Sequence, residues 1–136
     1  MRTVTMSAGL RHISILIYGG GVERGDEKPI RWVGSALDDL RDLPADVQDD
    51  LGYQIGRVQQ GLDPDDWKPM KDVGSGCREI RVRTSDGAFR TFYVASFGGV
   101  IYVLHCFQKK AQKTSKSDIE LGRQRYKAAS AHAKEK

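Results

Sequence analysis

The sequence predicts an α+β domain in which a helical hairpin packs on a small antiparallel sheet. Two observations support this class. Apolar residues recur at helical spacing between residues 35 and 62, and three strand-like segments separated by tight turns follow between residues 78 and 107. The chain has 136 residues, which is enough for one domain with its own core. The expected element order is β-α-α-β-β-β-α.

The two ends of the chain differ from its centre. A single apolar stretch at 13–18 is followed by three glycines and a polar run. Runs of glycine interrupt helices and strands. We therefore expect residues 1–28 to form a flexible extension, with at most a short strand at 12–18. The folded domain is expected at 29–127, and residues 128–136, which lack large apolar side chains, are expected to fray.

The first half of the domain is expected to contain a short strand at 30–33 and two helices. Ser35 and Asp38 have the spacing of a capping box before the first helix, and Pro44 suits the first turn of the second. The second helix carries an apolar stripe spaced by three or four residues, consisting of Val47, Leu51, Ile55, Val58 and Leu62. Its opposite face is rich in aspartate. A loop is expected at 64–76.

Three strands are expected at 78–83, 89–96 and 100–107. Ser85-Asp86-Gly87 and Gly98-Gly99 separate them, and both are tight-turn signals, so the strands form an antiparallel meander. The last strand is almost wholly apolar, as expected of a strand buried on both faces.

A last helix is expected after the meander. Ser117 and Glu120 repeat the capping-box spacing at its start. Ile119, Gly122, Tyr126 and Ala129 mark a narrow helical face.

Charge is divided unevenly along the chain. Residues 35–66 carry nine acidic and two basic side chains, whereas residues 104–136 carry nine basic and three acidic ones. A basic second half can bind a polyanion, although solvated helix faces would explain the same charges. Cys77 and Cys106 lack a CxxC pair, and no apolar run approaches the roughly 20 residues of a membrane span. We therefore expect a cytoplasmic protein with no metal and no cofactor.

Several motifs occur in an order typical of one toxin superfamily. The most specific is Tyr-Val-Leu-His-Cys-Phe-Gln-Lys-Lys at 102–110. It is preceded by Trp-Lys-Pro-Met at 67–70, Cys-Arg-Glu-Ile-Arg-Val at 77–82 and Phe-Arg-Thr-Phe-Tyr-Val-Ala at 89–95. With these motifs, residues 29–127 resemble the HigB-like, phage-related branch of the RelE/ParE toxins.

The resemblance implies a toxin held inactive by a cognate helix-turn-helix antitoxin. We expect the toxin alone to be a monomer that forms a larger assembly with this partner. The RelE and HigB branches cleave mRNA on the ribosome, whereas the ParE branch inhibits DNA gyrase on the same fold. A toxin-like protein that binds an antitoxin without activity of its own is a third alternative.

Metal-independent RNA cleavage requires a base, an acid and positive charge around the reacting phosphate. The resemblance assigns the phosphate-binding arginine to Arg90 and a basic pair at the strand end to Lys109 and Lys110. The alternative for Arg90 is a surface arginine paired with Glu79 or Asp86. We expect further RNA contacts from Arg81 and Arg83, which share a strand face by parity, and from Lys113.

Two residues of the last strand have both a functional and a structural interpretation. His105 is a candidate acid or base, but a histidine in so apolar a strand also suits a structural role. Phe107 shares its strand face and either stacks on a base or packs in the core. RelE-like toxins often carry a tyrosine after the basic pair. This chain has no aromatic residue at 114–117, which leaves the assignment of acid and base open.

Overall fold

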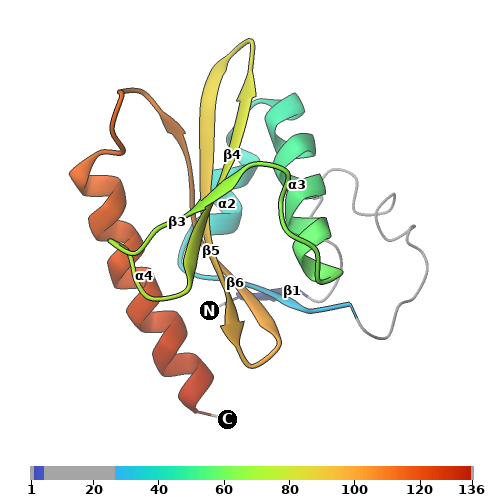
Figure 1. Cartoon of the computed structure of the whole chain (residues 1–136), viewed down its shortest axis with the longest axis vertical. Coiled ribbons are helices and arrows are strands. Elements are labelled where there is room, and N and C mark those ends of the chain that lie inside the picture. The colour runs from blue at the N-terminus through green and yellow to red at the C-terminus, as the bar shows by residue number, and fades with distance from the viewer. Residues whose placement is uncertain (1, 5–26, 136) are drawn as a thin grey trace.

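The computed structural model describes residues 2–4 and 27–135 and confirms the α+β class. Figure 1 shows helix α4 on one side of a sheet and helix α3 on the other. The elements in chain order are β1 (Arg2–Val4), β2 (Ile30–Trp32), α2 (Ala36–Arg41), α3 (Ala45–Gln59), β3 (Trp67–Pro69), β4 (Cys77–Thr84), β5 (Gly87–Phe97), β6 (Val100–Lys109) and α4 (Lys116–Lys134). The strand considered at 12–18 lies outside the described residues.

The six strands form one sheet in the order β1-β2-β6-β5-β4-β3. The meander of β4, β5 and β6 is antiparallel, as the turn residues predicted. The sheet as a whole is mixed, however, because β2 runs parallel to β6. A parallel pair needs a long crossover, and here the chain between β2 and β6, which forms α2, α3, β3, β4 and β5, provides it.

Two of the strands were not expected. Arg2–Val4 pairs antiparallel with β2, although it belongs to the segment predicted to be a flexible extension. Trp67–Pro69 pairs with β4 inside the predicted loop at 64–76. Each strand is three residues long, too short for an alternating pattern to show in the sequence. Both form because a neighbouring strand already presents free backbone groups along its edge.

The helical hairpin buries the predicted stripe against the sheet. Val47, Leu51, Ile55 and Val58 lie in a core cluster with Ile80 and Val82. Leu62 does not belong to the stripe: it is 48% exposed, because α3 ends at Gln59. Pro44 is the N-cap of α3 rather than part of its first turn. The Ser35 hydroxyl does not cap α2 and instead donates to Asp39.

Helix α4 covers the other face of the sheet over a second core cluster. Its N-cap is Ser115, which accepts from the Asp118 amide at 3.1 Å, two residues before the predicted cap. The helix continues through residues 128–134, where fraying was expected. Ala129 is buried there, and His132 lies 3.1 Å from the Tyr102 hydroxyl. Contacts with the sheet therefore order a segment that its own composition would not.

Glycines allow α4 to approach the sheet closely. A Cβ at Gly122 would lie 2.9 Å from the Phe92 ring, and one at Gly74 would lie 2.5 Å from the Tyr126 ring. Tyr126 in turn donates to the Ser75 carbonyl.

No helix in the described part of the chain is long and apolar enough to cross a bilayer.

Candidate functional site

Cationic side chains at alternate positions of the meander lie on the side of the sheet that α4 covers. In the strand register Arg81 lies opposite Arg90, and Arg83 lies opposite Ala88. Lys109, on the neighbouring strand β6, also lies opposite Ala88. These positions share the face of Phe92, which packs against α4. Strand parity therefore places these cations on one face, which the sequence predicted for Arg81 and Arg83.

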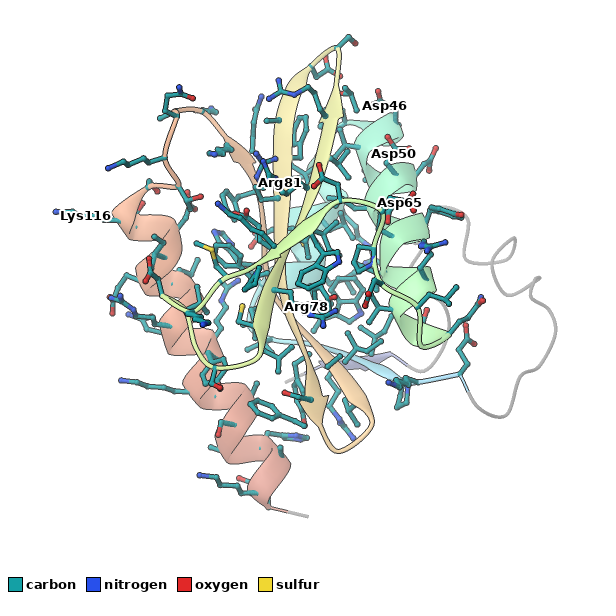
Figure 2. The ribbon with its side chains drawn as sticks, in the orientation of Figure 1. Asp46, Asp50, Asp65, Arg78, Arg81 and Lys116 are labelled. Carbon is teal, nitrogen blue, oxygen red and sulfur yellow. The ribbon has the colours of Figure 1, made fainter. Side chains whose placement is uncertain are left out.

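Four of the predicted cations line one open hollow of about 370 Å³, where β4 and β6 end and β5 begins: Arg83, Arg90, Lys109 and Lys110. A second hollow of about 220 Å³ shares the two lysines and adds Lys113. Arg81 lines neither hollow; its Nε lies 3.9 Å from Asp66 Oδ1. Figure 2 shows Arg81 beside β4 near the centre of the molecule. The two hollows together form a track suited to consecutive phosphates.

Arg90 is a buried arginine rather than a solvent-facing one, since only 5% of it is exposed. Its Nη1 donates to the Phe89 carbonyl at 3.0 Å, and its Nε lies 3.6 Å from Glu79 Oε1. Burial lowers the pKa of the Arg90 guanidinium from its usual value, and Arg81 and Arg83 act in the same direction. Arg90 does pair with Glu79, as the alternative interpretation of the sequence proposed. Both side chains are buried, however, so this is not a surface ion pair.

Glu79 is the residue of this site that sequence reasoning did not select. Its side chain is 1% exposed, with Lys68 Nζ at 3.9 Å and the Thr114 hydroxyl at 3.4 Å. Strand parity contained the signal, because Glu79 shares the face of Arg81 and is the only acid on that face of β4. The sequence did not indicate that the Glu79 side chain is buried; the tertiary structure shows this.

The surroundings of Lys109 disfavour its positive charge. Its partial burial lowers the pKa of its ammonium group, and the neighbouring Arg90 lowers it further. Glu79 acts in the opposite direction. At a given pH, a lysine whose pKa is lowered carries more of the unprotonated amine, which can accept a proton, than an ordinary lysine does. Lys110 is exposed at the rim of both hollows.

His105 and Phe107 lie between the sheet and α4 rather than in either hollow. The two rings stack at 4.5 Å, and His105 Nε2 lies 2.7 Å from Asp118 Oδ1 in the first turn of α4. Burial lowers the pKa of His105, while Asp118 raises it. Phe107 is 8% exposed within the second core cluster. This placement supports the structural interpretation of both residues.

The outer side of α3 carries the opposite charge. Asp46 and Asp50 are exposed there, and Figure 2 shows them far from Lys116 at the start of α4. Slight burial raises the pKa of Asp50, and Asp46 and Asp49 raise it further, as expected where like charges crowd. Tyr53, 56% exposed, belongs to the same helix.

A family model described as Phage derived protein Gp49-like (DUF891) matches residues 38–127. The match runs from α2 into α4 and includes Glu79, Arg90 and both lysines of the hollow. No curated protein matches the chain.

Proposed function

Because the chain belongs to the phage-derived Gp49-like family, which is associated with toxin–antitoxin toxins, we propose that it is a HigB-like toxin that cleaves mRNA on the ribosome. One observation carries the proposal. Arg90 and Lys109, whose surroundings lower the pKa of both side chains, line the same open hollow as Arg83 and Lys110. A cluster of cations on the ends of rigid strands suits a reaction in which negative charge builds up on a phosphate.

The proposed reaction uses the ribose 2′-OH as an internal nucleophile. The neutral amine of Lys109 accepts the proton of the 2′-OH, and the resulting oxygen attacks the adjacent phosphorus. The bond from phosphorus to the 5′-oxygen breaks, which leaves a 2′,3′-cyclic phosphate and a 5′-hydroxyl. Lys110 gives the 5′-oxygen its proton. Arg90 stabilises the charge on the phosphate oxygens.

The partner in this proposal is a basic helix-turn-helix antitoxin. The aspartates along the outer side of α3 support a contact there, because complementary charge directs protein association. Helix α3 lies on the other side of the sheet from α4 (Figure 1), whereas Arg90 and Lys109 share the face that α4 covers. The antitoxin would then meet the hairpin together with the rim of the sheet.

Primer extension on mRNA from cells that express the chain tests the activity. We expect discrete cleavages within translated codons for the wild type, and none for Lys109→Ala. Lys71→Ala, which removes an exposed lysine outside both hollows, is the matched control and should cleave normally. Intact mRNA accompanied by DNA damage would refute the endonuclease and point to gyrase.

A further inference from the structure

A buried carboxylate lies under the basic hollow and has no part in the reaction described above. Glu79 joins four segments of the chain. It belongs to β4; its Oε1 lies 3.6 Å from Arg90 Nε on β5 and 3.9 Å from Lys68 Nζ on β3. Its Oε2 accepts from Thr114, in the loop between β6 and α4, at 3.4 Å. That loop also carries Lys113.

Two atoms of this contact are buried without a hydrogen bond in the described part of the chain, Glu79 Oε1 and Arg90 Nε. They face each other at the distance of an ion pair, somewhat too far apart for a hydrogen bond. Arg90 Nη1 is held by the Phe89 carbonyl, and no described residue accepts from Nη2. The guanidinium is therefore oriented through two nitrogens, while Arg90 still lines the hollow.

Stability does not explain why a carboxylate occupies this position. A buried ion pair is often no more stabilising than two apolar side chains of similar size, because both charges lose their hydration. A charge fixed in a site of low dielectric constant does, however, orient its partner strongly. The orientation of Arg90 is thus the property that Glu79 supplies.

We propose that Glu79 is a positioning residue, which sets the direction of the Arg90 guanidinium and, through Thr114, holds the lysine-bearing loop beside the hollow. As far as catalysis is concerned, this role rests on the proposed endonuclease function. Catalysis by a fixed cation depends on its position, and a displacement of about 1 Å can cost roughly a hundredfold in rate. Glu79 itself does not line the hollow.

The first test measures the orientation of Arg90 without any RNA. The Arg90 Nε–H signal in ¹H–¹⁵N spectra of the full chain is compared among the wild type, Glu79→Gln and Thr114→Val. Glu79→Gln keeps the shape of the side chain and removes its charge, and we expect the signal to shift and its proton to exchange faster. Thr114→Val removes one hydrogen bond and should produce a smaller shift in the same direction. Glu120→Gln, at an exposed carboxylate paired with Arg123, is the control and should leave the signal unchanged.

The second test measures cleavage in a translating extract. We expect Glu79→Gln to lower kcat about tenfold to a hundredfold with little change in KM, because RNA still meets the same surface cations. An unchanged Arg90 signal in Glu79→Gln, or wild-type cleavage by that variant, would overturn the proposal. If Glu79→Gln fails to fold, the Arg90 Nε–H signal of Thr114→Val tests the proposal instead: a shift supports it, and an unchanged signal overturns it. A wild-type chain that cleaves no RNA would refute the proposed function, while the Arg90 signal would still test the positioning role.

Discussion

Replacing Arg90 with alanine tests both the activity and the architecture of the site. The side chain lines the hollow, yet it is 5% exposed and lies against a buried carboxylate. Arg90→Ala therefore removes the main cation of the proposed reaction and leaves Glu79 without its nearest partner on β5. An arginine on an open strand surface would show only the first effect.

The two effects have different magnitudes. A preorganised group that stabilises developing charge contributes about 3 kcal/mol to the transition state, so its loss lowers the rate roughly a hundredfold or more. Breaking a buried ion pair by removing one member typically costs about 3–5 kcal/mol of stability. We therefore expect Arg90→Ala to lose growth inhibition and also to unfold at lower denaturant concentration.

A double variant separates stability from activity. Arg90→Met combined with Glu79→Leu replaces the pair with apolar side chains, so its free energy of unfolding should return to within about 2 kcal/mol of the wild type. Growth inhibition and mRNA cleavage should remain absent. Urea unfolding of the purified proteins and primer extension from expressing cells measure the two quantities. Full toxicity of the double variant would refute the role of Arg90, and an unchanged unfolding midpoint of Arg90→Ala would refute the buried pair.

Four further predictions follow from other parts of the fold. Burial lowers the pKa of His105 from its usual value, so the folded state binds fewer protons there than the unfolded state. The free energy of unfolding should therefore fall as the pH drops from about 7.5 to about 5.5, and it should fall less steeply in His105→Asn. A strong loss of cleavage by His105→Asn with folding intact would instead make this histidine catalytic. Lys110→Ala should reduce cleavage more than Lys113→Ala, because Lys110 lines both hollows and Lys113 lines one; equal cleavage rates would contradict this. Deleting residues 1–26 removes β1 but none of the residues in the two described core clusters, so differential unfolding should show a loss of no more than about 1 kcal/mol. Asp46→Lys with Asp50→Lys should weaken antitoxin binding in titration calorimetry, and an antitoxin contact confined to α4 would argue against the acidic face.

Local periodicity was sufficient to predict the elements of the fold that repeat a pattern over many residues. Val47, Leu51 and Ile55 identified the buried side of α3, because three or four residues complete a helical turn. Alternation along β4 placed Arg81 and Arg83 on one face of the sheet for the same kind of reason. The resemblance to RelE-like toxins, and not periodicity, selected Arg90, Lys109 and Lys110.

The environment of those cations depended on segments distant in sequence. Buried Arg90 lies against Glu79 of β4, which Lys68 of β3 also approaches, and β3 is held in place by pairing with β4. The last turns of α4 are ordered by docking on Tyr102, about thirty residues earlier in the chain. The sequence by itself determined the periodic elements and the face on which the charges lie. Only the tertiary structure decided which charges lose contact with water, since burial depends on what packs against a residue and not on its neighbours along the chain.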